Sequence, residues 1–389
     1  MTPFDFQPRT RIVFGVDKLE DLGRLALELD ARRALVVSDA GVIEAGHTQH
    51  GLDALQDAGL DTLLFQDFRE NPTTEDVERG AEMARPWAPD MIVGLGGGSS
   101  LDCAKGINFV FSNGGQMADY WGVGKASLPM LPMIAVPTTA GTGSEAQSFA
   151  LISDAQTHVK MACGDKKAAC RIAVLDPRLT VTQPPRVTAL TGIDALAHAL
   201  ETQVTKPRNL LSQTFSREAW RLLAANLARV LVNPEDLEAR SGMQLGACLA
   251  GLAIENSMLG AAHALANPLT AACGVAHGEA VALMLPHVIR FNGQAVAATY
   301  EDLLRATAGS DPQALPVPGG SPADSVERLA DFIQQLRDSA GLKSRLSECD
   351  VQRDRLPQLA ADAAQQWTGT FNPRELTQAD CLQLYEQAF

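Results

Sequence analysis

Three of the seven histidines lie in apolar sequence, and an aspartate stands four residues before the first of them. The segment Asp194-Ala-Leu-Ala-His198 places a carboxylate and an imidazole on one face of a helix. His263 and His277 follow, fourteen residues apart. Taken singly, each could be a hydrogen-bonded core histidine. Together, one carboxylate and three imidazoles suit a divalent first-row metal with an open coordination position, and Fe(II) and Zn(II) both accept these ligands.

A glycine-rich turn is the second feature that could do chemistry. The apolar run Met91–Leu95 leads directly into Gly96-Gly97-Gly98-Ser99-Ser100-Leu101-Asp102. Glycines permit a tight turn and close approach to a ligand, and a following helix directs free N–H groups and its positive end at an anion. A pyrophosphate suits this position after a strand. The spacing is neither GxGxxG nor a Walker A loop, and a purely structural turn is the alternative.

Two further segments follow apolar runs. Residues 137–145, PTTAGTGSE, hold four hydroxyls and two glycines, which suit phosphate or ribose oxygens, although most such loops are only loops. Asp39 ends the segment Val36-Val37-Ser38-Asp39. A carboxylate just beyond a strand accepts hydrogen bonds from an adenosine ribose and repels a 2′-phosphate, which favours NAD over NADP. The alternative for Asp39 is a helix N-cap.

The elements that must position these residues differ between the two halves of the chain. Apolar runs predict strands buried on both faces, with helical patterns between them at Leu19–Leu29 and Thr74–Ala84. We expect Arg9–Phe14 to add an antiparallel strand and Arg171–Leu175 another. The predicted strands are Ala34–Ser38, Thr62–Phe65, Met91–Leu95 and Met133–Val136. This order predicts a doubly wound, Rossmann-like parallel-sheet domain over residues 1–185.

After about residue 185 the pattern becomes helical, which predicts an all-helical metal-binding domain over residues 186–389. The expected helices are Val187–Thr205, Leu210–Val232, Pro234–Ser257, Val326–Ala340 and Gln352–Thr368. Residues 309–321, GSDPQALPVPGGS, have the composition of a loop, and Ser321 is the expected N-cap of the next helix. The apolar region 245–286 is interrupted by polar residues, so it reads as buried helix rather than a membrane span.

Composition excludes several partners. The net charge of −14 repels phosphate backbones and anionic headgroups, so we expect neither nucleic-acid nor membrane binding. The first fifteen residues have no signal-peptide pattern. Seven cysteines, an odd number without a CxxC pair, indicate thiols of a reducing compartment. We therefore expect a cytoplasmic protein.

Several motifs, in order, resemble the iron-containing (group III) alcohol dehydrogenases. They are GGGSSLDCAK, PTTAGTGSEA, GIDALAHALE and HALANPLTAACGVAHGEAVALMLPHVIRFN, and the likeness runs from RIVFG at residues 11–15 to Asn372-Pro373-Arg374. The resemblance implies a dehydroquinate synthase-like fold, with an NAD(P)-binding domain, a helical metal domain and a catalytic cleft between them. It also implies that the four metal ligands are Asp194, His198, His263 and His277.

The resemblance implies cofactor contacts as well. Gly96, Gly97, Gly98 and Ser99 would hold the pyrophosphate, in a motif that includes Asp102. Thr138, Thr139 and Thr142 would line the cofactor, and an acidic residue at Asp39 goes with NAD preference. Asn71 and Lys160 match positions near the cofactor, but surface or capping roles are equally open to these two.

One residue departs from the family pattern. Close relatives active on small diols often carry a second histidine at the position of Asn267. An amide forms hydrogen bonds but does not relay a proton at neutral pH. Any catalytic role of Asn267 is therefore different, and a ribose hydroxyl with water, or another side chain, is an alternative proton path.

The expected function is metal-dependent hydride transfer between NAD(H) and a small alcohol or aldehyde, with the metal polarising the substrate oxygen. Relatives imply a homodimer or larger homo-oligomer. Three alternatives stay open at this point. They are a lyase or synthase like dehydroquinate synthase, a metal-independent enzyme like maleylacetate reductase, and a non-catalytic nucleotide- or metal-binding sensor.

Overall fold

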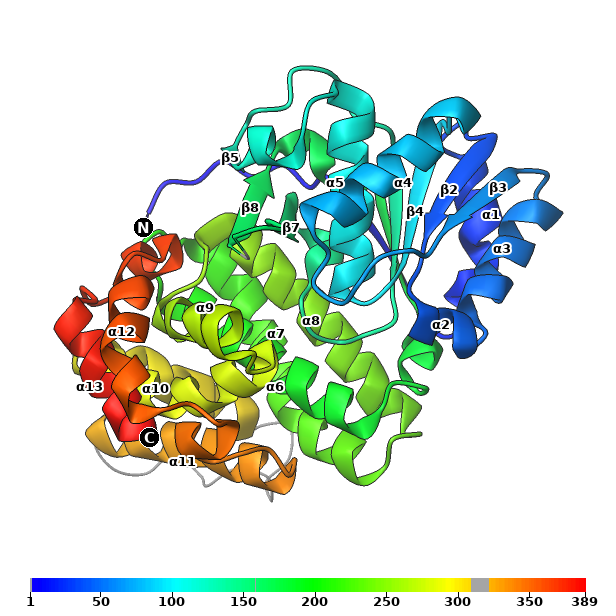
Figure 1. The fold of residues 1–389 in the computed structure, drawn as a ribbon. Helices are drawn as coiled ribbons and strands as arrows, with labels where there is room; N and C mark the ends of the chain where they lie inside the picture. Colours follow the sequence, from blue (N-terminus) through cyan, green and yellow to red (C-terminus); the bar gives the residue numbers. More distant parts are fainter. Residues whose placement is uncertain (1, 158, 309–321) are drawn as a thin grey trace. The chain divides into compact units, whose positions relative to one another are not determined.

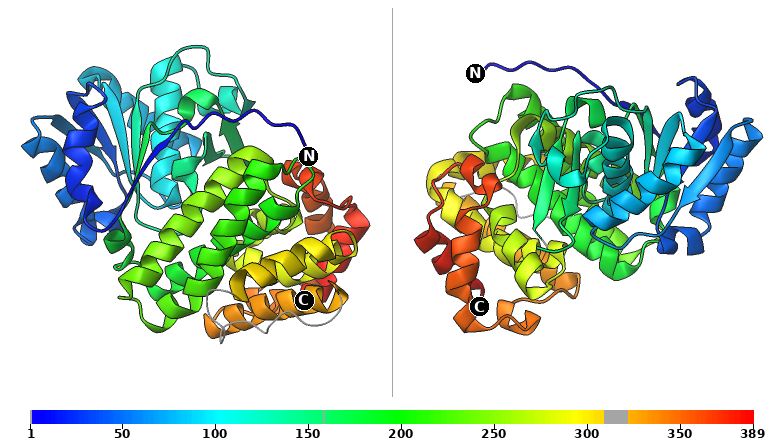
Figure 2. Two further views of the ribbon diagram at one scale, coloured as in Figure 1. Left: turned by 180° about the vertical axis from the view of Figure 1, so that it is seen from behind. Right: turned by 45° about the horizontal axis from the view of Figure 1, so that its top comes forward.

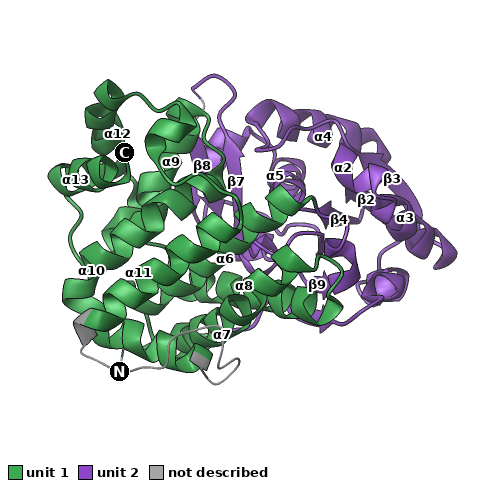
Figure 3. Ribbon diagram, turned by 90° about the horizontal axis from the view of Figure 1, so that it is seen from below, with its two compact units in different colours: residues 1–6, 184–389 green, residues 7–183 purple. Residues whose placement is uncertain are grey.

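The computed structural model describes residues 2–157, 159–308 and 322–389 (Figure 1). The chain divides into two compact units (Figure 3). One unit contains residues 7–183, and the other contains residues 1–6 with 184–389. The first six residues, which the sequence assigned to the α/β domain, thus group with the helical unit, where the Phe6 ring lies 6.0 Å from that of Phe215.

The unit of residues 7–183 is built on a six-stranded parallel sheet. Its spatial order is β1 (Arg11–Phe14), β9 (Ile172–Leu175), β6 (Met133–Pro137), β4 (Met91–Gly96), β2 (Arg33–Val37) and β3 (Asp61–Phe65). The predicted strands are confirmed to within two residues at each end. From β2 the chain moves outward to β3 and then returns to the other side as β4. The switch point of the topology therefore lies between β2 and β4, where ligands of such sheets bind.

The predicted direction of the first strand is wrong. β1 runs parallel to β9, with Arg11 opposite Ile172 and Phe14 opposite Leu175. A four-residue strand carries no sign of its own direction in its side chains. Its direction is set by a partner about 160 residues later in the chain, which a local reading of the sequence does not supply.

Helices cover both faces of this sheet (Figure 1). Leu35 and Val37 of β2 pack into a core with α4 (Thr74–Trp87) and α5 (Gly98–Asn113). Ala34 and Val36 point the other way, into a core with α1 (Leu22–Leu27) and α3 (His47–Asp57). Because both faces are covered, strands β4, β6 and β9 carry no polar side chain, as the sequence indicated. The short helix α2 (Ala40–Glu44) follows β2, and a 3-10 turn at Lys18–Asp21 replaces the start of the predicted helix Leu19–Leu29.

The sequence did not predict a second, three-stranded sheet. Its order is β5 (Gly122–Val123), β8 (Lys160–Gly164) and β7 (Phe149–Ser153), with β7 and β8 antiparallel. In β7 the buried Ala150 and Ile152 alternate with the exposed Leu151. β7 was not predicted, although residues 149–152 form an apolar run like those of the large sheet.

The other unit is helical, and its described residues contain no strand. Its long helices pack side by side, with α7 against both α6 and α8 (Figure 2). The helices are α6 (Pro185–Val204), α7 (Leu210–Val232), α8 (Leu237–Ser257), α9 (Ala261–Cys273), α10 (His277–Ala308), α11 (Pro322–Ser339), α12 (Leu356–Ala364) and α13 (Gln378–Ala388). The expected loop at 309–321 and the N-cap Ser321 lie outside the described residues.

One predicted helix is wrong. Gln352–Thr368 is not continuous but consists of a 3-10 turn at Arg353–Arg355, then α12, then a 3-10 turn at Trp367–Phe371. Pro357 lies in the first turn of α12, where its missing N–H costs nothing, so it starts a new helix instead of extending an old one.

The apolar region 245–286 forms the end of α8, all of α9 and the start of α10. Among the described residues, no single helix has the length and composition to cross a membrane. Helices α8 and α9 pass that test only as a pair, and they are bent by 103° relative to each other.

Candidate metal centre and cofactor loops

Three helices of one unit bring the four predicted metal ligands together. Asp194 and His198 lie one turn apart on α6, His263 lies in the first turn of α9, and His277 is the first residue of α10. The Nε2 atoms of the three histidines lie 3.5, 3.3 and 3.7 Å from Oδ1 of Asp194, for His198, His263 and His277 respectively. The three imidazoles thus converge on one carboxylate oxygen of Asp194.

These separations fit donors around a single ion. Two ligand atoms each about 2.1 Å from a tetrahedral metal stand roughly 3.4 Å apart. Asp194 Oδ1 and His263 Nε2 are buried and form no hydrogen bond within the described part of the chain, although they face each other. Buried polar atoms without a hydrogen bond are rare unless another partner is present. Donor atoms of Asp194, His263 and His277 all lie within 4.8 Å of one another, and Nε2 of His198 lies 3.5 Å from Asp194 Oδ1 beside them. This donor set fits a divalent metal.

The exposure of the four side chains is uneven. Asp194, His198 and His263 are 5–8% exposed, whereas His277 is 26% exposed. Of the four side chains, that of His277 is therefore the most open to solvent.

The charges of the cluster are coupled. Burial raises the pKa of Asp194, but His198, His263 and His277 outweigh it and hold that pKa well below its usual range. Burial lowers the pKa of His263, but Glu201 and Asp194 outweigh it and raise that pKa to about 9. The site therefore favours an ionised aspartate, which is the form that binds metals.

Glu201 is a site residue that the sequence analysis did not assign. It is buried on α6, and its Oε2 accepts a hydrogen bond from Nδ1 of His263 at 2.6 Å. The available signal was its spacing, because Asp194, His198 and Glu201 stand at i, i+4 and i+7 and share one helix face. Its partner is 62 residues away, so the contact itself was not predictable from spacing.

Asn267 lies one turn beyond His263 on α9. Its side-chain amide donates a hydrogen bond to Oε1 of Gln366 at 3.0 Å. The structure thus gives Asn267 a hydrogen-bonding role, and its catalytic role stays a prediction.

In the other unit, the predicted glycine turn lies at the carboxyl end of β4. Gly97 is the N-cap of α5, with no side chain to cap the helix, and Gly96 has a φ of 154°. A Cβ on Gly96 would lie 2.2 Å from Oγ of Ser100, and one on Gly98 would lie 2.6 Å from the methyl group of Thr142. These positions require glycine, and they leave the backbone at the helix start uncovered by side chains of its own.

The second loop lies beside the first because their strands are neighbours. Gly96 pairs with Pro137 across β4 and β6, and the N–H of Thr138 donates to the carbonyl of Gly96 at 3.0 Å. Side-chain atoms of Thr139 and Thr142 approach Gly97 and Gly98 respectively. The structure therefore brings all the predicted glycines and threonines to one edge of the sheet.

Asp39 closes this edge at the end of β2. Its Oδ1 accepts hydrogen bonds from the N–H groups of Gly41 and Val42, so Asp39 is the N-cap of α2. Its Oδ2 accepts from the hydroxyl of Ser100 at 2.8 Å, next to the glycine turn. The capping role and a place beside the candidate cofactor loop are thus compatible.

A buried lysine ties α5 to the second loop, and the sequence analysis did not assign it. Nζ of Lys105 donates to the carbonyls of Ser144, Gln147 and Phe149 at 2.5–3.0 Å. Asp102 accepts from the hydroxyl of Ser144 at 2.7 Å. Burial raises the pKa of Asp102, against the opposing effects of Lys105 and Ser144. Asp102 thus supports the loop through Ser144.

Asn71 and Lys160, the two less certain cofactor residues, lie side by side. Nζ of Lys160 is 3.5 Å from Oδ1 of Asn71. The backbone N–H of Asn71 donates to Oγ of Ser99 at 3.2 Å, which places both residues beside the glycine turn.

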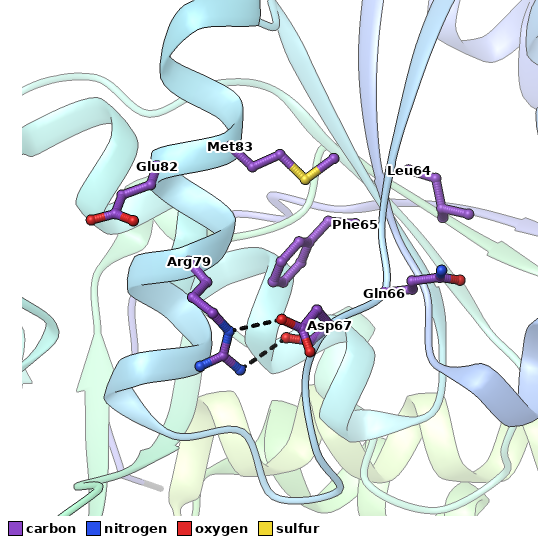
Figure 4. A pocket seen from close by; sticks show the side chains of 7 residues that line it. All are labelled: Leu64, Phe65, Gln66, Asp67, Arg79, Glu82 and Met83. Carbon is purple, nitrogen blue, oxygen red and sulfur yellow. Dashed lines mark hydrogen bonds and ion pairs between the residues drawn. The ribbon is translucent and has the colours of Figure 1, made fainter.

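A pocket of about 490 Å³ contains none of the predicted site residues (Figure 4). It lies between the end of β3 and α4 and is lined by Leu64, Phe65, Gln66, Asp67, Arg79, Glu82 and Met83. Within it, Arg79 is paired with Asp67 at 3.0 Å. Two of its three charged groups are therefore engaged with each other, and the pocket supplies no catalytic set.

Comparison with known families covers nearly the whole chain. Residues 8–177 match the family model described as iron-containing alcohol dehydrogenase. Residues 188–389 match the C-terminal model of the Fe-containing alcohol dehydrogenase family. The chain belongs to the iron-containing alcohol dehydrogenase family. It is thus an enzyme of the alcohol dehydrogenase class, as the motifs indicated.

Individual relatives match this alcohol dehydrogenase over the full or nearly full length of both chains. The NAD-dependent methanol dehydrogenase of Bacillus methanolicus is 32% identical over 388 residues, covering 100% of both chains. A solved 1,3-propanediol oxidoreductase is 30% identical, with a TM-score of 0.95 over 100% of both chains. The sulfoacetaldehyde reductase of Bifidobacterium kashiwanohense, solved with NAD+, is 27% identical, with a TM-score of 0.88 over 100% of this chain and 99% of that one. These structures confirm the predicted fold class.

Proposed function

We propose that this alcohol dehydrogenase transfers hydride between NAD(H) and a small alcohol or aldehyde at one bound Fe(II), with Zn(II) as the alternative ion. The proposed ligands are Asp194, His198, His263 and His277. The observation that carries the proposal is the convergence of three imidazole Nε2 atoms within 3.3–3.7 Å of Asp194 Oδ1. When bound, a divalent metal supplies Lewis-acid polarisation of the substrate oxygen.

At this centre the protein holds the ligand atoms in place before the metal binds. Asp194 supplies the negative charge, which favours a divalent cation over water at this buried position. Because three separate helices contribute the donors, the packing of α6, α9 and α10 fixes their spacing. Such a preformed set keeps the cost of ordering the side chains out of the binding step.

We propose that the pyrophosphate of NAD binds at the start of α5. The uncapped N–H groups after Gly97 and the positive end of the helix favour an anion. Thr138, Thr139 and Thr142 place their hydroxyls at the same edge of the sheet, beside the switch point between β2 and β4. The relatives named for NAD, or solved with it, support this choice of cofactor.

We propose NAD as the preferred cofactor over NADP because of Asp39. Its Oδ2 makes one hydrogen bond, to Ser100, which leaves that oxygen able to accept another from a ribose hydroxyl. A 2′-phosphate at the same place would meet the carboxylate charge. Asn71 and Lys160 are proposed to contact the cofactor from the side of Ser99.

The substrate is proposed to be a small alcohol or aldehyde. The relatives carry the names of methanol, 1,3-propanediol and sulfoacetaldehyde, which are all small molecules. The Asn267 amide is held by Gln366 and does not relay a proton at neutral pH. We therefore propose that Asn267 orients the groups that bind beside His263. The hydroxyl proton of the alcohol substrate is then proposed to leave through a ribose hydroxyl of the cofactor and water.

Assembly and location are also proposals. We propose a homodimer or larger homo-oligomer in the cytoplasm. All seven cysteines are free thiols and six of them are buried, which is compatible with a reducing compartment.

The test is NADH oxidation with short aldehydes after anaerobic loading with Fe(II) or Zn(II). His263→Ala is expected to lower kcat/KM by at least about 100-fold, because it removes one of four ligands. His50→Ala is the matched control, since His50 is an exposed histidine on α3, and it should keep full activity. Turnover that is indifferent to His263 would favour the metal-independent reductase, and NAD binding without turnover on any alcohol or aldehyde would favour the sensor.

A further inference from the structure

One face of α6 carries two of the proposed metal ligands and a third buried polar residue. Asp194, His198 and Glu201 follow one another at i, i+4 and i+7, and all three are buried. Buried carboxylates need partners. Asp194 faces the three imidazoles, so the partners of Glu201 decide what this second carboxylate does.

Both oxygens of Glu201 are used at the start of α9. Oε1 accepts a hydrogen bond from the backbone N–H of Ala262 at 2.6 Å. Oε2 accepts from Nδ1 of His263, also at 2.6 Å. The carboxylate thus spans two consecutive residues of α9, one through the backbone and one through the side chain.

The start of α9 depends on this contact because it has no cap of its own. The N-cap residue is Gly260, which offers no side chain. The N–H of Ala261 instead donates to Oδ1 of Asn372 at 3.3 Å, and that of Ala262 donates to Glu201. A Cβ on Gly260 would lie 3.1 Å from both accepting oxygens. Side chains from distant segments therefore cap the first turn of α9 and fix the position of the His263 backbone.

The contact also selects the tautomer of His263. A carboxylate accepts hydrogen bonds and does not donate them when ionised, so Nδ1 must carry the proton. A neutral ring with this proton on Nδ1 presents its lone pair at Nε2, and that atom lies 3.3 Å from Asp194 Oδ1. This is the tautomer that a metal bound at Nε2 requires.

We propose that Glu201 is a positioning residue of the metal centre. It holds the His263 ring in the Nδ1–H tautomer with Nε2 directed at the ion, and it ties that ring to the first turn of α9. The inference rests on the proposed metal site. It assigns to Glu201 no contact with the ion or the substrate.

The test compares Zn(II) affinity in three purified chains, measured by competition with a chelating dye. Glu201→Gln keeps the size of the side chain but removes the charge and one acceptor from His263. It is expected to weaken Zn(II) binding 10- to 100-fold, as for other residues that orient metal ligands. Glu218→Gln is the control, because Glu218 pairs with Arg221 on α7 in the same unit, and it should bind Zn(II) as the original chain does. Thermal unfolding of the metal-free chains separates a loss of stability from a loss of affinity.

A second readout follows the proton itself in the Zn(II)-loaded protein. In the original chain, ¹⁵N–¹H spectra should show His263 bound through Nε2, with a solvent-protected proton on Nδ1. In Glu201→Gln that proton should lose its protection and exchange rapidly with solvent, because its charged acceptor is gone. Equal Zn(II) affinity of Glu201→Gln and the original chain would overturn the proposal. If Glu201→Gln does not fold, the spectra of the original chain decide alone. Zn(II) bound to Nδ1 of His263, instead of Nε2, would overturn the proposal. Failure of the original chain to bind Zn(II) or Fe(II) at all would instead overturn the proposed function.

Discussion

Asp39 uses its two carboxylate oxygens for different purposes. Oδ1 caps α2, and Oδ2 faces Ser100 beside the glycine turn. The sequence suggested these as competing interpretations of one residue, cap or cofactor selector. The structure shows that one carboxylate has enough acceptor positions for both.

Asp39→Asn tests the selector role without removing the cap. The asparagine oxygen still caps α2, but the negative charge that would repel a 2′-phosphate is gone. We expect the kcat/KM ratio of NADP to NAD to rise about tenfold, which corresponds to about 1.4 kcal/mol. Steady-state kinetics with both cofactors measure it. Asp61→Asn is the control, because Asp61 is an exposed aspartate at the start of β3, at the other edge of the sheet from Asp39. It should leave the ratio as it was. An unchanged ratio in Asp39→Asn would show that Asp39 does not select the cofactor.

Met258 holds a backbone conformation that is ordinarily left to glycine. Its φ is 64° and its ψ is −179°, in the turn between α8 and α9 that leads to His263. For a residue with a Cβ, this region costs about 1–3 kcal/mol. Met258→Gly and Met258→Ala lose the same side-chain packing and differ mainly in that strain. We therefore expect Met258→Gly to be more stable than Met258→Ala by about 1–2 kcal/mol in urea unfolding, and the reverse order would show that this turn is unstrained.

At the scale of elements, α4 shows how a buried carboxylate fixes the start of a helix. Asp76 accepts hydrogen bonds from the backbone N–H and hydroxyl of Thr73 and pairs with Arg79. Burial raises the pKa of Asp76, but these partners outweigh it and hold that pKa below its usual value. The start of α4 is therefore tied to an ionised side chain.

Asp76→Asn should lower the free energy of unfolding by about 2 kcal/mol at pH 7. Because the pKa of Asp76 is lower in the folded chain, its ionised form stabilises the fold above the unfolded value of about 3.9. That contribution is lost as the pH falls through the lower folded value. The difference between the original chain and Asp76→Asn should thus be constant from neutral to mildly acidic pH and shrink below about pH 4.

Urea unfolding across this pH range measures the effect. Asp380→Asn provides the matched control, because Asp380 forms the same capping box with Thr377 at an exposed helix start. Its cost should be smaller, about 1 kcal/mol or less. Equal costs at the two positions would show that burial adds nothing to the cap at Asp76.

Elements also mark the limit of sequence prediction. The buried strands, the glycine turn and the ligand set could be predicted because each has a local pattern of residue types. The direction of β1, the pairing of β5 with β8 and the partner of Glu201 could not, because each depends on a segment distant in the chain. Lys105 belongs with these, since its three carbonyl acceptors lie about 40 residues later and meet its Nζ only in the folded chain.

At the scale of the whole molecule, one unit carries the proposed metal-binding residues and the other carries the proposed cofactor-binding residues. All four proposed metal ligands belong to the unit that includes residues 184–389, and all the proposed cofactor residues belong to residues 7–183. A ligand stabilises the folded part that binds it, by about 2.7 kcal/mol at a concentration of 100 Kd.

Hydrogen exchange followed by mass spectrometry should separate the two effects. Zn(II) alone should slow exchange in peptides from α6, α9 and the start of α10, and NAD alone should slow it around the turn from β4 to α5. Protection by Zn(II) confined to residues 7–183 would contradict the division of roles.

The central claim is that one metal ion is held by these four side chains. Anomalous diffraction at the iron edge, from crystals grown anaerobically with Fe(II), tests it most directly. We expect one peak per chain, within about 2.0–2.2 Å of a carboxylate oxygen of Asp194 and of Nε2 of His198, His263 and His277. A chain that takes up no iron under these conditions, or a peak bound by other residues, would contradict it.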